Sequence, residues 1–463
     1  MSGMKQRLAN VIDGLEADYA DIRTEENRKT DIAFEGKELR RIASYATHGG
    51  HLRVYNSGGR ATASFTAVAD ARGAAERAAA AARLAGGHRA QALSLAAAPV
   101  ETGAFPLSPR LDPRRIPLPE KLELLSHYNR IVLSHADVVT TQCVYDEFSS
   151  SRTFVTTEGT AVEYDLLIVN IAGLIVVRRG DVVQRVRFAF GGSDDFSTLL
   201  GRDEELKERV EKARELLSAD PVTAGTYPVV LDPDEAGVFI HEAFGHLSEA
   251  DGLQDNPEFK KRLELGTVLG APILNVTDDP GLLDRPGGYV IDDEGVRGVK
   301  TALISEGVLV GRLHSRETAA AFGEPLSGNM RAVDAQFTPI VRMSNILIEP
   351  GGSTFDDMVG SIDDGYYLVG AKGGQTSGDQ FSFGAQWGYR ISSGRLGPMV
   401  RDINMSGELF STLRGISMIG DDVRFGERGG CGKGGGGPMQ LNRKSGRGAP
   451  RIKIDSVTVG GAR

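Results

Sequence analysis

The chain has few cysteines, no long uninterrupted apolar run and no surplus of basic residues. Its two cysteines, Cys143 and Cys431, cannot build a disulfide framework, so we expect a reducing compartment in which a thiol is free to bind metal. The longest apolar stretch, residues 166–177, is interrupted by Asn170 and is too short to span a bilayer. No association with a membrane is therefore expected.

The charge balance argues against another class of protein. The 463 residues include 53 Lys and Arg against 62 Asp and Glu, which gives a net charge of -9. Binding to nucleic-acid phosphates needs concentrated cations, and no basic stripe is present, so direct nucleic-acid binding is not expected. The first 28 residues are charged throughout and lack the apolar core and cleavage site of a signal peptide. We expect a cytoplasmic protein.

The distribution of glycine and of helical patterns predicts an α+β fold. Glycines concentrate after residue 300 among short β-prone segments, whereas the clearest helical patterns lie earlier. We expect two mixed helix/sheet N-terminal units and a β-rich C-terminal domain with a strongly curved antiparallel sheet. The predicted boundaries are residues 1–96 for an N-terminal α/β unit, 97–119 for a proline-rich linker, 120–224 for a central helix/sheet unit and 225–463 for the C-terminal domain.

The segment His241–His246 carries the strongest chemical signal in the chain. Two histidines flank Glu242, Ala243, Phe244 and Gly245. In the common zinc-peptidase pattern H-E-x-x-H, both imidazoles lie on one helix face and share a metal ion, while the glutamate activates water. Because the chain holds only eight histidines, this arrangement predicts a metal site more readily than a chance pairing of buried imidazoles.

Local signals place this segment on a helix that follows a strand. The apolar run 227–231 ends at Asp232, a good N-cap, and Pro233 occupies the first helical position. Val238, Phe239, Ala243 and Leu247 would anchor the helix against a core. The helix is therefore expected to present its histidines and Glu242 to a cleft.

The histidines are one residue further apart than in the common pattern. At ~100° per residue, a regular helix would separate the two imidazoles by roughly 140°, too far for one tetrahedral ion. A single π-type turn would accommodate the extra residue, and Gly245 tolerates such a distortion with the least backbone strain. We expect the helix to depart from regular α geometry at Gly245.

A zinc site of this kind needs a third protein ligand. Cys431 lies in a glycine-rich loop, and its thiolate would leave one coordination position open for water, as in catalytic zinc sites. Nearby Lys433 would help to keep the thiol ionised. Cys431 could instead be an inert thiol in a flexible loop.

Two carboxylates compete with Cys431. Glu249 and Asp251 follow His246 closely, and either could be the third ligand, although the spacing of Glu249 also suits the orientation of an imidazole through its free nitrogen. The glycines around Cys431 match a nucleotide-binding G-x-G-x-x-G pattern, but no strand leads into them and no helix follows. Phosphate binding is therefore disfavoured.

With these motifs placed, the chain resembles the TldD/PmbA family of metallopeptidases, specifically its TldD side. Besides the histidine segment with Glu249 and Asp251, the similar motifs are Asp292-Asp293-Glu294-Gly295, Arg342-Met343-Ser344-Asn345, Gly351-Gly352-Ser353, Gly373-Gly374-Gln375 and Cys431-Gly432-Lys433. The N-terminal units resemble the family only in layout. One departure concerns Gly436, where the family commonly has Gln, so substrate contacts in that loop are expected to differ.

The resemblance implies one zinc ion per active subunit, held by His241, His246 and Cys431, with Glu242 as general base. It further implies a cytoplasmic peptidase of short or unfolded peptides, including leader peptides, that forms a homodimer or a heterodimer with a PmbA/TldE-type subunit. Two rival hypotheses remain. One is an exopeptidase with a carboxylate as third zinc ligand, and the other is a non-catalytic regulator of the kind once described as a DNA gyrase modulator.

Overall fold

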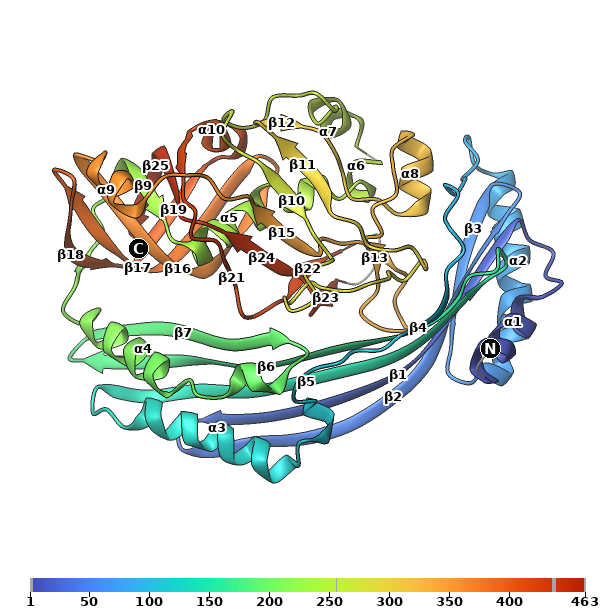
Figure 1. The fold of residues 1–463 in the computed structure, drawn as a ribbon, viewed down its shortest axis with the longest axis horizontal. Coiled ribbons are helices and arrows are strands. Elements are labelled where there is room, and N and C mark those ends of the chain that lie inside the picture. The colour runs from blue at the N-terminus through green and yellow to red at the C-terminus, as the bar shows by residue number, and fades with distance from the viewer. Residues whose placement is uncertain (1–2, 255, 435–438, 462–463) are drawn as a thin grey trace.

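A computed structural model of the protein describes residues 3–254, 256–434 and 439–461. The predicted effect of Gly436 lies outside these residues. Within the described part, no helix combines the length and apolarity needed to cross a bilayer. The predicted α+β class is confirmed, with helices and extensive sheets in one mixed architecture (Figure 1).

One long sheet runs beneath the whole molecule. It has the order β3-β2-β1-β5-β6-β4, with β7 also paired to β6. The sheet is straight along one side of the molecule and bends upward at the other (Figure 1). Its strands are β1 (Tyr19–Glu35), β2 (Glu38–Asn56), β3 (Gly59–Phe65), β4 (Thr102–Phe105), β5 (Val138–Thr156), β6 (Ala161–Arg179) and β7 (Val182–Ser193).

Helices cover this sheet in two pairs, each with its own core. Helices α1 and α2 pack on β1–β3 at the bent end through residues such as Leu8, Ala75 and Leu52. Helices α3 and α4 pack on β5–β7 through residues such as Leu125 and Leu206. The four helices are α1 (Gly3–Ile12), α2 (Ala71–Gly87), α3 (Leu118–Leu133) and α4 (Asp203–Glu215).

The two predicted N-terminal units share this single sheet. Strand β1 of the first unit pairs antiparallel with β5 of the second from Asp21–Thr156 to Glu35–Gln142. The segment 97–119, predicted from its prolines to be a linker, contains β4, which pairs parallel with β6. It also holds the short 3₁₀ helix Pro113–Arg115. Strand pairing between segments far apart in sequence leaves no local signal, so the sequence did not reveal the common sheet.

The C-terminal domain is built on a second, strongly curved sheet. Strands β16, β9, β25, β19 and β17 follow one another in order, and an additional β16–β17 pairing closes the sheet on itself. Most pairings are antiparallel, but β9 pairs parallel with β16 because the chain leaves β9 through a helix before it returns. The strands are β8 (Asp220–Pro221), β9 (Gly225–Leu231), β16 (Asp364–Ser377), β17 (Gln380–Ser392), β18 (Arg395–Arg401), β19 (Ile403–Glu408), β20 (Ile416–Ile419) and β25 (Ile452–Gly461).

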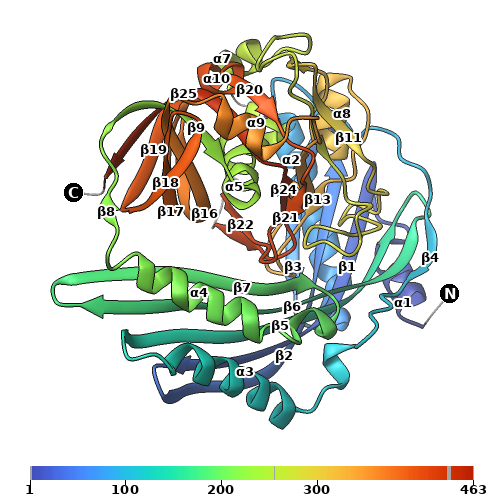
Figure 2. The same ribbon diagram turned by 60° about the vertical axis from the view of Figure 1, so that its left-hand side comes forward.

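A smaller sheet with short helices completes this domain, and helix α5 (Pro233–Ala243) lies between the two sheets (Figure 2). The strands are β10 (Val276–Asp278), β11 (Thr301–Ser305), β12 (Val308–Leu309), β15 (Asn345–Ile348), β21 (Arg424–Phe425) and β24 (Gly446–Ala449), besides the separate pairs β13 (Met330–Arg331) with β14 (Ile340–Val341) and β22 (Cys431–Lys433) with β23 (Gln440–Asn442). The helices are α6 (Asp251–Gln254), α7 (Pro257–Arg262), α8 (Arg316–Phe322), α9 (Phe355–Gly360) and α10 (Leu409–Arg414).

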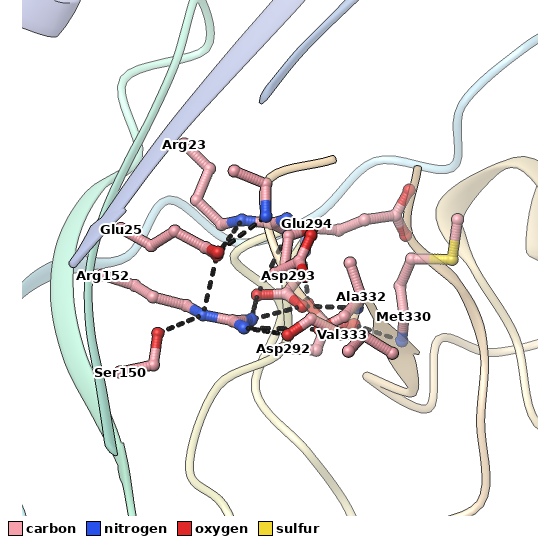
Figure 3. Close-up of polar contacts among 12 residues, drawn as sticks. Arg23, Glu25, Ser150, Arg152, Asp292, Asp293, Glu294, Met330, Ala332 and Val333 are labelled. Carbon is pink, nitrogen blue, oxygen red and sulfur yellow. Dashed lines mark hydrogen bonds and ion pairs between the residues drawn. The ribbon is translucent and has the colours of Figure 1, made fainter. Parts of the chain in front are cut away.

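A buried network of ion pairs joins the long sheet to the C-terminal domain (Figure 3). Arg152 of β5 donates from one guanidinium nitrogen to both oxygens of Asp293, at 2.7 and 2.8 Å. Arg23 of β1 lies 3.3 Å from the same carboxylate, and Glu25 lies 3.3 Å from Arg152. Asp292 accepts hydrogen bonds from the backbone of Met330 and of its own loop. These contacts fix the position of the C-terminal domain over the long sheet.

Candidate metal centre

Helix α5 positions the first two residues of the predicted site. It begins where the sequence signals placed it: the Asp232 side chain accepts a hydrogen bond from the Glu235 amide at 2.9 Å, and Pro233 follows the cap. Strand β9 delivers the helix, and Phe239 and Ala243 are fully buried in the largest core of the domain. His241 and Glu242 lie in the last turn of this anchored helix.

The helix breaks before the second histidine, but the predicted π-type turn is wrong. Helix α5 ends at Ala243, Phe244 leaves helical geometry at φ -123°, and Gly245–Ser248 forms a 3₁₀ turn. The tighter turn brings the imidazoles of His241 and His246 together, with ring centroids 5.3 Å apart and planes at 83°.

Gly245 is needed for space rather than for backbone freedom. Its φ is not in the left-handed region. A Cβ atom at this position would lie 2.1 Å from Met343 Sδ and 2.9 Å from Ile346 Cδ1, well inside van der Waals contact. The glycine therefore lets the 3₁₀ turn pack directly against the segment that leads into β15.

Cys431 completes the predicted set of three side chains. It lies on β22, almost two hundred residues from the histidines, and its Sγ is 3.1 Å from Nε2 of His246. One ligand atom from each of His241, His246 and Cys431 lies within 4.8 Å of the other two. Arg342 donates to the carbonyl oxygen of Cys431 at 2.7 Å and so fixes the backbone of this strand.

The chemistry of these residues fits a metal ion. His241 is only 4% exposed, yet neither of its ring nitrogens has a hydrogen-bond partner among the described residues. Burial, reinforced by the charge of His246, holds the pKa of His241 well below its ordinary value, so the ring is neutral with a free lone pair. A buried imidazole without partners is costly unless something binds it, and a metal ion does so.

Glu249 orients the second histidine. Its carboxylate is fully buried, lies 3.0 Å from Nδ1 of His246 and accepts a hydrogen bond from the Met343 amide at 3.1 Å. Burial lowers the pKa of His246, but its hydrogen bonds to Cys431 and Glu249 outweigh that effect and raise the pKa to about 10. Loading the site with a divalent metal is therefore expected to release a proton, as is usual for imidazole and thiolate ligands.

The other predicted carboxylate, Asp251, contacts groups other than the three candidate ligands. Its oxygens contact Lys433 Nζ at 2.6 Å and the Val341 amide at 3.1 Å. Lys433 also contacts Glu249 at 2.9 Å, so its ammonium group neutralises these two carboxylates rather than the Cys431 thiol, which corrects the role predicted for it. Both competing carboxylates are thus engaged elsewhere.

Glu242 lies where the site opens. Its carboxylate is partly exposed and 3.9 Å from Nε2 of His246, and its backbone carbonyl accepts a hydrogen bond from Thr376 of β16 at 3.0 Å. Burial raises the pKa of Glu242, while the positive charges of His246 and Arg447 lower it to a smaller extent. Glu242 and Cys431 both line a cavity of about 1660 Å³ between the long sheet and the C-terminal domain.

Sequence reasoning missed two kinds of residue near this site. Arg447 and Lys372 line the cavity beside α5, although neither belongs to a recognisable motif. Asp278 and Asp292, each the first of two adjacent aspartates, are buried and accept several hydrogen bonds each. The adjacent aspartates at 278–279 and 292–293 were a signal for the two buried carboxylates, whereas nothing in the local sequence distinguishes Arg447 and Lys372.

Two imidazoles and a thiol that converge beside a glutamate at a large cavity define a metal-dependent hydrolase. Family patterns described as PmbA/TldA metallopeptidase domain 1, central domain and C-terminal domain match residues 20–82, 111–219 and 224–461. The chain therefore belongs to the TldD/PmbA family of metallopeptidases, and the predictions of this family and of a peptidase are confirmed. Family membership supports a metal cofactor.

Several relatives match most of the chain. A metalloprotease of Synechocystis is 37% identical over 448 residues, which cover 96% of this chain and 95% of the relative. A metalloprotease of Methanothermobacter thermautotrophicus is 35% identical, with 96% of each chain covered. A zinc metalloprotease TldD homolog of Saccharolobus solfataricus is 34% identical over 298 residues, or 62% of this chain and 64% of the relative.

Solved structures share the fold at low sequence identity. A Thermotoga maritima protein described as a candidate modulator of DNA gyrase matches with a TM-score of 0.79 at 19% identity, over 98% of this chain and 99% of that one. TldE from Thermococcus kodakarensis matches with a TM-score of 0.74 at 18% identity, over 99% and 100%. These likenesses show that the chain shares its fold with both of these proteins.

Proposed function

We propose that the protein is a zinc-dependent peptidase that hydrolyses short or unfolded peptides, including leader peptides, with little sequence specificity. His241, His246 and Cys431 would hold one zinc ion per active subunit. The observation that carries the proposal is the convergence of these three side chains around a buried imidazole that has no partner among the described residues. The zinc metalloprotease among the relatives supports the choice of metal.

Each residue of the site has a defined task in this reaction. His241, His246 and Cys431 would hold the zinc ion, which would supply Lewis-acid chemistry for the scissile carbonyl and the attacking water. Glu242 takes a proton from that water on its carboxylate and passes it to the leaving amine. The raised pKa of Glu242 suits this transfer, because the carboxylate holds the proton until the amine departs. Glu249 keeps Nδ1 of His246 occupied, so that Nε2 faces the metal position.

The peptide is proposed to bind as an extended strand. Strand β16 lines the cavity along residues 369–373 and then passes the general base, where Thr376 contacts the carbonyl of Glu242. Pairing through main-chain hydrogen bonds would provide affinity with little dependence on side chains. Cleavage confined to one side-chain class at the scissile bond would contradict this mode of binding.

The assembly and the compartment are part of the proposal. We place the protein in the cytoplasm, as a homodimer or as the active subunit of a heterodimer with a PmbA/TldE-type chain. The fold shared with TldE is compatible with both arrangements. Light scattering of the purified chain, alone and with a TldE-type partner from the same organism, distinguishes them.

The decisive test combines metal analysis with mass spectrometry of an unstructured peptide. The purified protein should contain about one zinc ion per chain and should cleave the peptide. Glu242→Gln should retain zinc and the folded state but lower the hydrolysis rate by roughly 10²–10⁴-fold, because general acid–base catalysis contributes on that order. An unchanged rate would exclude this mechanism and favour a non-catalytic regulator in which zinc is structural.

A further inference from the structure

We propose that the catalytic cavity selects peptides that carry carboxylates, and that Arg447 and Lys372 bind a substrate carboxylate beside the metal centre. This inference rests on the proposed peptidase function and specifies its substrate class. The first observation is that the cavity lining has the opposite sign of charge to the whole chain. The whole chain has an excess of acidic residues, but the described residues that line the cavity include twelve Lys and Arg against nine Asp and Glu.

Ion pairing with groups outside the cavity leaves this difference in place. Six of the cavity's carboxylates each pair with a basic side chain: Asp31, Asp146, Glu205, Asp234, Asp402 and Glu427. Two of the cations involved, Arg202 and Arg401, do not line the cavity themselves. In turn, two cavity cations, Lys212 and Arg451, pair with Glu215 and Asp422 outside the cavity, so the excess of cations is unchanged.

Many of the cavity's cations keep an uncompensated charge. Arg185, Arg187, Lys372, Arg424 and Arg428 line the cavity, and none of them has an ion-pair partner in the part of the chain that the structure describes. Low-dielectric walls focus the field of such charges, so the cavity attracts anions although the protein as a whole repels them. A peptide rich in Asp or Glu matches this field.

Arg447 is the cation best placed to contact a substrate near the scissile bond. Its aliphatic stem runs along α5, where a Cβ on Gly237 would lie 3.6 Å from Arg447 Cγ. On the other side, a Cβ on Gly426 would lie 3.4 Å from its Nε. The two glycines thus leave room for an arginine side chain that lines the cavity close to Glu242.

The guanidinium of Arg447 has unused hydrogen-bonding capacity. Its Nε is buried without a hydrogen-bond partner among the described residues. One terminal nitrogen donates to the Arg428 carbonyl at 3.4 Å, and the other lies 3.5 Å from Asp234, so both contacts are long. Its terminal nitrogens therefore keep donors for a carboxylate, which a guanidinium binds in two-point fashion, whereas the buried Nε is closed to the cavity.

Lys372 extends this subsite along β16. It is half-buried, it lines the same cavity, and its backbone carbonyl accepts a hydrogen bond from Arg187. The charges of Lys372 and Arg447 both act on the buried carboxyl of Glu235, which places the two cations around one segment of α5. Together they form a cationic path from β16 towards the metal centre.

Binding and cleavage are measured with matched unstructured peptides that differ only in Glu or Gln at three positions, each with a free or an amidated C-terminus. Binding to Glu242→Gln by fluorescence anisotropy tests the charge preference without hydrolysis. We expect the Glu peptides to bind at least ten-fold more tightly than the Gln peptides, with a difference that shrinks as salt is added. A preference that follows only the free C-terminus would assign the subsite to the terminal carboxylate.

The variants assign the preference to residues. Arg447→Gln and Lys372→Gln, each in the Glu242→Gln background, should remove most of the difference between Glu and Gln peptides. The matched control is Arg115→Gln, an arginine with 87% of its side chain exposed outside the cavity, which should leave the difference intact. Arg447→Lys provides a second variant that keeps the positive charge but loses the planar guanidinium group and its two-point hydrogen bonding.

Two outcomes separate this inference from the proposed function. Equal binding of Glu and Gln peptides would overturn the charge preference, even if the wild-type protein cleaves both. Selective binding of the Glu peptides without cleavage by the wild-type protein would overturn the peptidase proposal and leave the subsite supported. Loss of the preference in Arg115→Gln would show that overall charge, and not this subsite, controls binding.

Discussion

At the scale of single residues, the metal centre is assembled by contacts that do not involve metal. Asp232 caps α5, Glu249 holds Nδ1 of His246, and Arg342 fixes the carbonyl of Cys431. Because each ligand side chain or its backbone is held by a neighbour, the three ligand atoms converge before any ion binds. The free-energy cost of burying unpaired polar atoms falls on His241, whose ring nitrogens have no hydrogen-bond partner among the described residues.

Cys431→Ser tests the third ligand. A serine hydroxyl is a much poorer zinc ligand than a thiolate, so we expect zinc content to fall below a tenth of the wild-type value after dialysis, with a parallel loss of hydrolysis. Metal content is measured by atomic emission on the dialysed protein. The matched control is Cys143→Ser, a cysteine in the core of the long sheet, far along the chain from the metal centre. Full zinc and activity in Cys431→Ser would favour a carboxylate ligand and the exopeptidase hypothesis.

Gly245→Ala tests the packing explanation of the odd histidine spacing. The added Cβ would overlap Met343 and Ile346, so we expect the free energy of unfolding to drop by about 1–3 kcal/mol and the zinc affinity to fall as His246 shifts. Chemical denaturation and competition with a chromogenic chelator measure the two effects. Gly252→Ala, at a position where a Cβ has nothing within 4 Å, should change neither by as much. Equal effects in both variants would contradict the explanation.

At the scale of elements, the loop that carries Asp292–Glu294 anchors the C-terminal domain to the long sheet. Asp293 accepts from Arg152 and Tyr164, while Glu294 accepts from Arg53 of β2 and from the Arg316 amide of α8. All of these side chains are buried, so removal of one partner leaves an uncompensated charge. This explains why an acidic run that is usual in a solvent-exposed turn lies at the centre of an interface.

Asp293→Asn should therefore be strongly destabilising and should alter the response to acid. Burial raises the pKa of Asp293, but Arg152 and Arg23 outweigh that effect and hold it well below the ordinary value. A carboxylate whose pKa is depressed by folding stabilises the protein above its unfolded pKa, near 4, and this contribution is lost as the pH falls further. We expect a loss of about 3–5 kcal/mol at pH 7 that becomes smaller at pH 3.5.

Urea unfolding of the wild type and of Asp293→Asn at the two pH values measures this difference. The exposed Asp284, with 74% of its side chain accessible, provides the control Asp284→Asn, which should change stability little at either pH. A pH-independent difference between wild type and Asp293→Asn would indicate that the carboxylate contributes by packing rather than by charge.

At the scale of the whole molecule, the long sheet and the C-terminal domain enclose the cavity between them. Strands β5–β7 supply one wall, and β16 with the segment 424–432 supplies the other, which contains Glu242 and Cys431 (Figure 1). Glu242, the proposed general base, therefore faces a space that only the assembled protein forms.

Removal of zinc should weaken the assembled fold as well as abolish hydrolysis. A ligand present at one hundred times its Kd stabilises the folded state by about 2.7 kcal/mol. A chelator should therefore lower the Tm by a few degrees, and added zinc should restore both Tm and activity. Glu242→Gln should show the same shift, whereas Cys431→Ser should show little, because it lacks a ligand. Differential scanning fluorimetry measures the shift, and an equal response of the two variants would argue against binding through Cys431.

Local patterns predicted α5, its cap, its buried face and the three side chains, His241, His246 and Cys431, that the structure brings together. Local patterns gave wrong predictions where contacts between residues far apart in sequence determine the structure. The turn at Gly245 is 3₁₀ rather than π because of its contact with Met343, which no local pattern contains. Lys433 lies on Glu249 and Asp251 rather than on the thiol for the same reason.

The sequence by itself determined the chemistry of this protein: the histidines, the glutamate and the cysteine, and with them the family. Residue type and near-neighbour spacing suffice for that, because metal ligands and helix caps are properties of short segments. The tertiary structure alone decided that the two N-terminal units share one sheet, that Cys431 meets His246, and that the cavity is lined by unpaired cations. Those features depend on contacts between distant residues, whose energies appear only once the chain is folded.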